Sequence, residues 1–159
     1  MKDTTPIKRH PAMVSFSKDH HFGLLLVWKI RQGLTKSVEA GRIGKYVLYF
    51  FSEDLLKHFE DEEKWLFSRL RADDLLRIQA EEDHAAIYQL IKDIGKHTED
   101  TALLTKLADR LEKHIRFEER ELFNHLQSVI GTDELALIEK RIGNDSKEID
   151  EKWDDVFWI

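Results

Sequence analysis

The chain carries one pattern of potential metal ligands twice. Residues 58–67 read HFEDEEKWLF and residues 114–123 read HIRFEERELF, and both fit His-x-x-x-Glu-Glu-x-x-Leu-Phe. On a helix, residues four apart lie on the same face, so each histidine stands beside the first glutamate of its pattern. An imidazole nitrogen next to a carboxylate oxygen can bind iron, manganese or zinc. The two candidate pairs are His58 with Glu62 and His114 with Glu118.

The length of the repeated pattern sets it apart from chance. With 8 histidines and 31 acidic residues among 159, an acid falls four residues after a histidine once or twice in any such chain, and pairs at this spacing are ordinary on polar helices. Here the second glutamate, the leucine and the phenylalanine also recur in register. The repeat therefore predicts two helices with equivalent roles in one bundle.

A second, shorter repeat supplies two more histidines. Asp19-His20 begins the run DHHFGLLLVWKI, and Asp83-His84 begins the run DHAAIYQLIKDI. When the two Asp-His pairs are aligned, apolar residues at helical spacing coincide. The chain thus offers His, His-x-x-x-Glu, His and His-x-x-x-Glu in order. His20 shares the apolar stripe of its run, whereas His21 lies about 100° further round the helix, so His20 is the preferred candidate.

Polar groups on apolar stripes need partners, because an unsatisfied buried polar group costs about 1–3 kcal/mol. Two carboxylates brought together without a cation would repel each other. Four imidazoles and two carboxylates are too many for one tetrahedral zinc. They suit two ions bridged by the glutamates, with some positions left open. The candidate ligands are His20, His58, Glu62, His84, His114 and Glu118.

Composition indicates a soluble helical protein that forms a single domain over residues 1–159. Hydrophobic residues make up 42% and charged residues 35% of the chain, with only 2 prolines and 7 glycines. The net charge of −6 and the lack of a basic cluster argue against nucleic acid and membrane partners. The absence of cysteine excludes disulfides and thiolate chemistry. Without a signal core or a spanning apolar run, we expect a cytoplasmic protein.

The apolar periodicity predicts an all-α, up-down-up-down four-helix bundle over about residues 15–130. A polar, extended N-terminal arm precedes the bundle, and Ser15 or Ser17 is expected to cap the first helix. A C-terminal helical extension, residues 132–159, follows the bundle. Its last residues are too apolar for a free tail, so they should pack on the bundle or on a partner subunit. Helices are expected over about residues 15–37, 45–71, 74–95 and 101–129.

These residues resemble the hemerythrin-like cation-binding domain family, also called the HHE domain, over about residues 9–130. The lead RHPAMVSFSKDHH is also similar to the start of bacterial members. The resemblance implies a four-helix bundle with a di-iron centre, so iron is the preferred metal, with manganese or zinc as alternatives. It also implies that the six candidate ligands named above are the metal ligands.

The chain departs from the oxygen-carrying hemerythrins at two positions. Those proteins have a further histidine where Tyr88 stands, four residues after His84, and a terminal aspartate where Glu119 stands, five residues after His114. The set of four histidines and two glutamates is closer to that of the iron-centre-repair proteins of the family. We therefore expect a protein that binds or senses oxygen, nitric oxide or iron. A di-iron oxidase or peroxidase and an iron-centre-repair protein are the alternatives, so enzymatic activity stays open, and no partner protein is specified. A metal-free bundle that acts through partners would leave the repeat unexplained.

The other notable side chains have plainer interpretations. Histidines expected at the surface or beside the ligands are His10, His97 and His125. Glu63 and Glu119 are expected to be solvated or to orient a ligand histidine. Trp28 and Trp65 are expected in the core. Tyr88 has three possible roles: lining the metal pocket, hydrogen-bonding a bound ligand, or packing alone.

Overall fold

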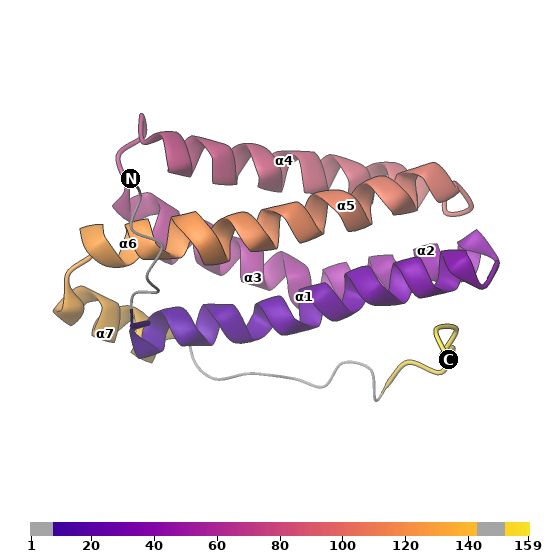
Figure 1. The fold of residues 1–159 in the computed structure, drawn as a ribbon, viewed down its shortest axis with the longest axis horizontal. Helices are drawn as coiled ribbons and strands as arrows, with labels where there is room; N and C mark the ends of the chain where they lie inside the picture. The colour runs from indigo at the N-terminus through magenta and orange to yellow at the C-terminus, as the bar shows by residue number, and fades with distance from the viewer. Residues whose placement is uncertain (1–7, 143–151) are drawn as a thin grey trace.

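The computed structural model describes residues 8–142 and 152–159, and its regular structure within these ranges is entirely helical. Four long helical segments lie lengthwise alongside one another, with the links between them at the two ends (Figure 1). The first is α1 (Pro11–Thr35) and the third is α4 (Leu75–Lys96). A further helix, α7 (Thr132–Ile142), follows the fourth segment. The prediction of an all-α protein is confirmed.

The second and fourth long segments each consist of several pieces. The second contains α2 (Ala40–Phe50), the π-helical turn η1 (Phe51–Leu55), α3 (Leu56–Asp61), the π-helical turn η2 (Glu62–Leu66) and the 3-10 turn η3 (Phe67–Arg69). The fourth contains α5 (Thr101–Phe117), the π-helical turn η4 (Glu118–Leu122) and α6 (Phe123–Val129). Hydrogen bonds in a π-helical turn join residues five apart instead of four. A search for 3.6-residue periodicity does not predict such turns.

Aspartate side chains cap two of the long helices at their predicted starts. The Oδ1 atom of Asp74 accepts hydrogen bonds from the N–H groups of Leu76 and Arg77, at 2.9 and 3.2 Å. Asp100 does the same for the N–H groups two and three residues further on, at 2.9 and 3.3 Å. Each carboxylate thus satisfies N–H groups that have no partner within the helix.

The first helix starts earlier than predicted. It begins at Pro11 rather than after Ser15 or Ser17, so the expected extended arm is wrong for residues 11–14. His10 is the cap, because its Nδ1 atom accepts a hydrogen bond from the N–H of Ala12 at 3.1 Å. Proline suits the first helical position, which needs no N–H donor. A histidine cap is outside the usual serine, threonine, aspartate and asparagine set, which explains the error.

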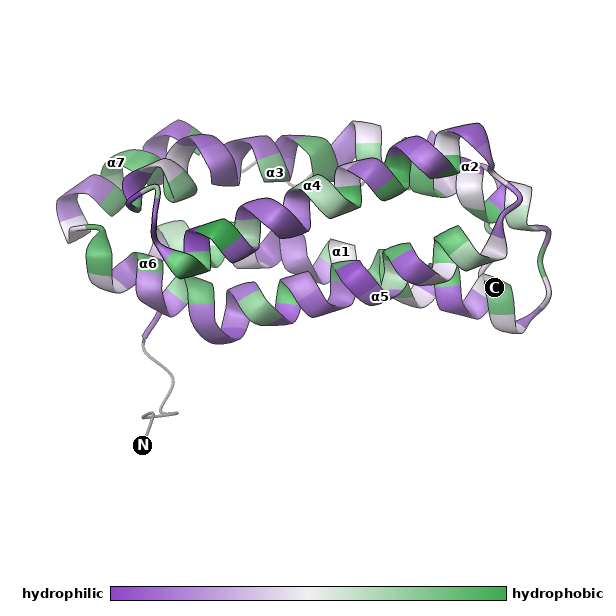
Figure 2. Cartoon of the chain, turned by 90° about the horizontal axis from the view of Figure 1, so that it is seen from above, coloured by the Kyte–Doolittle hydropathy of each residue, from purple (hydrophilic) through white to green (hydrophobic). Residues whose placement is uncertain are grey.

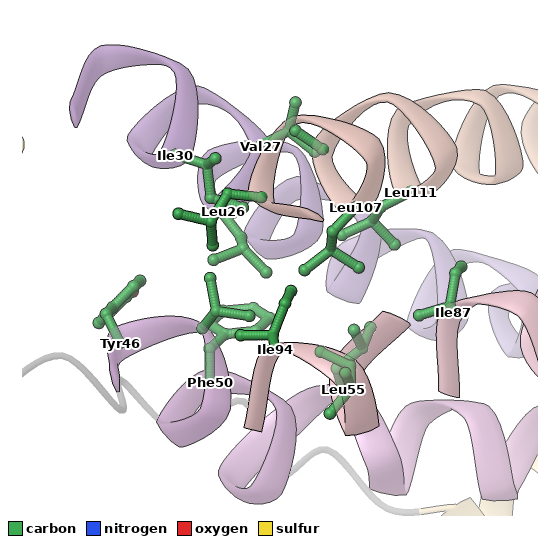
Figure 3. Close-up of a cluster of buried hydrophobic side chains, with 14 of the residues drawn as sticks. Leu26, Val27, Ile30, Tyr46, Phe50, Leu55, Ile87, Ile94, Leu107 and Leu111 are labelled. Carbon is green, nitrogen blue, oxygen red and sulfur yellow. The ribbon is translucent and has the colours of Figure 1, made fainter. Parts of the chain in front are cut away.

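Two apolar clusters fill the interior of the bundle. Figure 3 shows part of the larger cluster, where side chains of α1, α2, α4 and α5 point toward one another. Its buried members include Leu26, Ile30, Tyr46, Phe50, Ile94, Leu107 and Leu111. The smaller cluster includes Met13, Phe16, Leu66, Phe67, Leu122, Phe123, Leu126 and Leu135. Hydrophilic and hydrophobic residues alternate along the helices in Figure 2, as expected for helices with one buried face.

The described C-terminal residues, 152–159, pack against the bundle as predicted, although they form no regular helix. Phe157 is buried. The ring of Tyr46 on α2 lies 5.8 Å from that of Phe157 and 5.0 Å from that of Trp158. The ammonium of Lys29 on α1 lies 4.1 Å from the centre of the Trp158 ring, close enough for a cation–π interaction. The helical extension expected over residues 132–159 is found in α7, which ends at Ile142, and residues 143–151 lie outside the described residues.

The described helices include none that combines the length and the apolar character needed to cross a membrane.

A close approach beside Gly44 yields a test of the packing. The second segment begins at Ala40 rather than near Lys45, so Gly44 lies in α2 and not in a loop. A Cβ atom on Gly44 would lie 2.7 Å from the carbonyl oxygen of Thr98. We expect Gly44→Ala to lower the free energy of unfolding by about 1–3 kcal/mol, because the backbone must move. Urea titration followed by circular dichroism measures this.

Gly41 on the same helix is the matched control. A Cβ atom there would meet no atom within 4 Å. Gly41→Ala should leave stability unchanged or raise it by up to about 1 kcal/mol, because alanine favours the helix over glycine. Equal stabilities of the Gly44 and Gly41 variants would contradict the close contact between α2 and Thr98.

Candidate metal centre

The six candidate ligands converge between the two apolar clusters. On α1, for example, His20 lies between Phe16 of the smaller cluster and Leu26 of the larger. The ligand atoms form two overlapping groups, and within each group all of them lie within 4.8 Å of one another. The first group is His20, His58, Glu62 and Glu118, and the second is Glu62, His84, His114 and Glu118. All six residues are buried, and both glutamates belong to both groups.

Each glutamate faces one histidine from each group. The Oε1 atom of Glu62 lies 3.2 Å from Nε2 of His58 and 3.3 Å from Nε2 of His84. The corresponding distances from Oε1 of Glu118 are 3.0 Å to Nε2 of His20 and 3.2 Å to Nε2 of His114. The four Nε2 atoms therefore all point at the two carboxylates. This arrangement could let both glutamates bridge a pair of cations.

Most of these ligand atoms lack a hydrogen bond in spite of their proximity. The unpaired buried atoms are Nε2 of His58, His84 and His114, both carboxylate oxygens of Glu62, and Oε2 of Glu118. An unpaired buried polar atom costs about 1–3 kcal/mol, so a set of six needs a further partner. A mixed set of imidazole nitrogens and carboxylate oxygens fits iron, manganese or zinc. The residues present therefore fit a metal centre.

Behind each imidazole, a carboxylate from a neighbouring segment contacts the Nδ1 atom. The pairs are His20 with Glu119 (2.6 Å), His58 with Asp19 (2.9 Å), His84 with Glu63 (3.3 Å) and His114 with Asp83 (2.9 Å). Every long segment contributes one of these histidines and one of these carboxylates, and the pairs close a circle through the four segments. We call Asp19, Glu63, Asp83 and Glu119 the carboxylate ring.

The carboxylate ring fixes both the orientation and the tautomer of the histidines. A neutral imidazole that donates its Nδ1–H to a carboxylate keeps its lone pair on Nε2, which here faces the centre. Such partners also increase the basicity of a ligand histidine, and their removal typically lowers metal affinity about 10- to 100-fold. The ring thus prepares four nitrogen donors that are aimed at one place.

Two members of the carboxylate ring were anticipated from the sequence, and the other two were missed. Glu63 and Glu119 were expected to orient histidines or to be solvated, and they lie at Nδ1 of His84 and His20. Asp19 and Asp83 received no role, although each directly precedes a candidate ligand histidine. The repeated Asp-His pair was the available signal. Its meaning depends on which helices are neighbours, because each aspartate contacts a histidine of the next segment.

Both glutamate ligand candidates begin a π-helical turn. The N–H of Phe67 donates to the carbonyl oxygen of Glu62, and the N–H of Phe123 donates to that of Glu118, five residues back in each case. The wider turn changes the helical register directly after each glutamate. As a result both the leucine and the phenylalanine that end each repeated pattern are buried. The repeated sequence pattern thus covers a repeated backbone irregularity, of a kind that is frequent at functional sites.

Without a bound cation, protons balance the buried carboxylates. Burial disfavours the charged imidazole, but nearby carboxylates outweigh it and raise the pKa of all four histidines. The pKa of His114 rises to about 10, because Glu118 and Asp83 lie on its two sides and outweigh burial. Burial alone would raise the pKa of Glu118, but His114, Glu62 and His20 hold it well below its ordinary value. A metal ion would have to displace these protons.

A comparison with models of protein families matched residues 18–126 to the Hemerythrin HHE cation binding domain. The match spans more than half of the chain and includes all six candidate ligands. The chain belongs to the hemerythrin HHE cation-binding domain family. A search of curated proteins and a search of solved structures gave no match.

The remaining histidines of this hemerythrin domain lie away from the centre. His21 is exposed, whereas its neighbour His20 is buried and reaches Glu118. The Nε2 atom of His125 lies 2.6 Å from Oδ2 of the helix-capping residue Asp74. Among the histidines outside the ligand set, His10 caps α1 and His97 is exposed.

Two aromatic residues of the domain differ in how well they were predicted. Trp28 is 50% exposed, so its expected place in the core is wrong. The reason is that it lies on the outer face of α1, on the same stripe as His21.

Tyr88 lies beside the centre, with its ring 6.3 Å from that of His84 and 5.7 Å from that of Phe59. Burial and nearby carboxylates, Glu63 foremost, raise the pKa of Tyr88, so it stays a neutral phenol.

Proposed function

We propose that this hemerythrin domain is a di-iron protein that binds or senses oxygen or nitric oxide. The proposal includes an up-down-up-down order of the four long segments and a single domain over the whole chain. The observation that carries it is the pair of overlapping ligand groups that share Glu62 and Glu118. A shared pair of carboxylates suits two cations better than one.

One ion would be held by His20 and His58 and the other by His84 and His114, with both glutamates between them. Four imidazoles and two carboxylates leave positions open on two six-coordinate ions. When bound, iron would supply a redox-active Lewis acid that can bind a small ligand at those positions. The protein's own part is to aim the nitrogen donors, exclude bulk water through the two apolar clusters, and keep the Tyr88 phenol protonated beside His84.

Metal analysis with an optical spectrum tests the proposal. Protein stripped of metal and reloaded with ferrous iron under argon should hold two iron ions per chain. Addition of oxygen or nitric oxide should then change the visible absorption. Tight binding of a single ion, or an iron-loaded protein that is indifferent to both gases, would contradict the proposal.

A matched pair of variants links the metal to the site. His20→Ala should lose iron, because its Nε2 faces Glu118 at 3.0 Å. His21→Ala on the same turn should keep both ions, because His21 is exposed. The opposite result would place the site on another face of α1. Turnover of an added reducing substrate in the presence of oxygen or peroxide would favour the oxidase or peroxidase alternative.

A further inference from the structure

Glu119 in the carboxylate ring connects a ligand histidine to a residue outside the helices. Its Oε1 atom contacts Nδ1 of His20 at 2.6 Å, and its Oε2 atom contacts Nη2 of Arg9 at 3.1 Å. The same Nη2 atom donates to the backbone carbonyl of Glu119 at 2.5 Å. Arg9 therefore binds both the side chain and the backbone of Glu119, the residue that orients His20.

Phe123 provides a second contact between the same groups. The imidazole of His20 stacks on the Phe123 ring, with the ring centres 5.1 Å apart and the planes 14° apart. The guanidinium carbon of Arg9 lies 5.3 Å from the centre of that ring, within range of a cation–π interaction. Arg9 thus contacts both side chains that set the orientation of His20.

A glutamine on α6 holds the segment that carries Arg9. The Nε2 atom of Gln127 donates to the carbonyl oxygen of Lys8 at 2.7 Å, and its Oε1 atom accepts from the N–H of His10 at 2.9 Å. These two hydrogen bonds lie on either side of Arg9. Residues 8–10, which we call the N-terminal clamp, are therefore fixed to the fourth long segment next to the metal centre.

The other half of the centre has a comparable arginine within a helix. Nη2 of Arg110 donates to Oδ1 of Asp83 at 2.8 Å, while Oδ2 of Asp83 contacts Nδ1 of His114 at 2.9 Å. Arg110 lies one turn before His114 on α5, so its backbone is held by the same helix as the histidine. The backbone of Arg9 is not part of a helix, because α1 begins only at Pro11. In the described part of the chain, neither Asp19 nor Glu63 has an ion pair with an arginine or lysine.

We propose that Arg9 is a positioning residue for one of the two metal ions. By holding Glu119, it keeps Nε2 of His20 aimed at the centre, so the N-terminal clamp sets how firmly the ion at His20 and His58 is held. Arg110 does the same through Asp83 for the ion at His84 and His114. This inference rests on the proposed two-ion centre. It adds that the two ions are controlled separately, one by Arg9 ahead of α1 and the other by Arg110 within α5.

The rate of iron removal tests the inference. Wild-type protein loaded with two ferrous ions under argon is mixed with a chromophoric ferrous chelator, and the release of each ion is followed by absorbance. His20→Ala and His114→Ala identify which phase belongs to which ion, because each variant loses one phase. Arg9→Ala should accelerate release of the ion at His20 and His58 by roughly 3- to 10-fold, at or below the low end of the effect of a direct partner of a ligand histidine.

Three further variants make the test selective. Arg110→Ala should accelerate only the other phase. Arg9→Lys should restore part of the effect, because an ammonium keeps the charge but lacks the planar fork of a guanidinium. Gln127→Ala, which frees the clamp without touching the ion pair, should change the same phase as Arg9→Ala. Circular dichroism of each variant checks that the fold persists.

The possible outcomes separate the inference from the proposed function. Unchanged release in Arg9→Ala, or equal acceleration of both phases, would overturn the role of Arg9 while the two-ion centre stands. Failure of the wild-type protein to bind two ions would overturn the proposed function, and this inference with it.

Discussion

Replacing either shared glutamate with glutamine should lower the number of tightly bound ions per chain from two to at most one. Glu62 and Glu118 are fully buried, and each faces one histidine of both ligand groups. Glutamine has nearly the same shape but carries no charge, so only one of the two ligand carboxylates would remain to balance the divalent cations. The loss of affinity should exceed the 10- to 100-fold effect that is typical of residues behind the ligands.

The metal content of Glu62→Gln and Glu118→Gln, measured after iron loading and gel filtration, checks this expectation. Glu60→Gln is the matched control, because Glu60 is exposed on α3 only two residues before Glu62. The control should keep two ions. Retention of both ions by Glu118→Gln would show that this carboxylate is not shared between them, and the two-ion centre would need another bridge.

Sequence reasoning reached the ligand candidates because their spacing is local. A histidine and an acid four residues apart lie together on any helix, and the repeat of His58 and Glu62 as His114 and Glu118 marks two such helices. The caps at Asp74 and the start of α5 were also predictable, because an aspartate satisfies the N–H groups next to it in sequence.

The features that sequence reasoning missed depend on contacts between segments or on rare backbone geometry. Asp19 and Asp83 act on histidines of the next segment, so their role requires the order of the helices in space. The π-helical turns at Glu62 and Glu118 break the 3.6-residue period on which the prediction relied. Arg9 reaches Glu119 across 110 residues of sequence, and no local pattern announces that contact.

The stability of the protein should fall at alkaline pH without metal and should be held nearly constant there by bound metal. The pKa of each ligand histidine is raised in the folded, metal-free protein. A raised pKa contributes stability that is complete below the ordinary histidine value of 6.5 and is lost as the pH rises through the folded value, about 10 for His114. Metal-free protein should therefore become less stable from about pH 6.5 toward pH 10.

The loss of stability of the metal-free protein at acid pH follows from the carboxylates. The pKa values of Glu118, Asp83 and Glu119 are lowered in the folded protein, because the favourable histidine contacts outweigh burial. Their contribution is complete above the ordinary values of 4.5 for glutamate and 3.8 for aspartate, and it is lost as the pH falls through the folded values. Metal-free protein should thus be most stable between about pH 5 and 6.5.

Bound metal cancels the alkaline loss, because it takes the place of the histidine protons in the folded protein. Each proton that binding displaces adds up to about 1.4 kcal/mol of metal-dependent stability per pH unit while the histidine is still protonated without metal. At a free metal concentration one hundred times the dissociation constant, binding raises the free energy of unfolding by about 2.7 kcal/mol. Because binding displaces histidine protons, this stabilisation should grow steeply between pH 6 and 8 at a fixed concentration of free metal.

Urea unfolding with and without zinc, which is redox-inert, measures the gain at several pH values in metal-buffered solution. The two stability curves should diverge as the pH rises, and the divergence should shrink in Asp83→Asn. That variant removes the anion behind His114, which lowers the pKa of the histidine and leaves fewer protons to displace. Curves that stay parallel from pH 6 to 8 would mean that zinc binds without displacing protons. The four imidazoles would then not be the metal ligands, whatever their arrangement around the two glutamates.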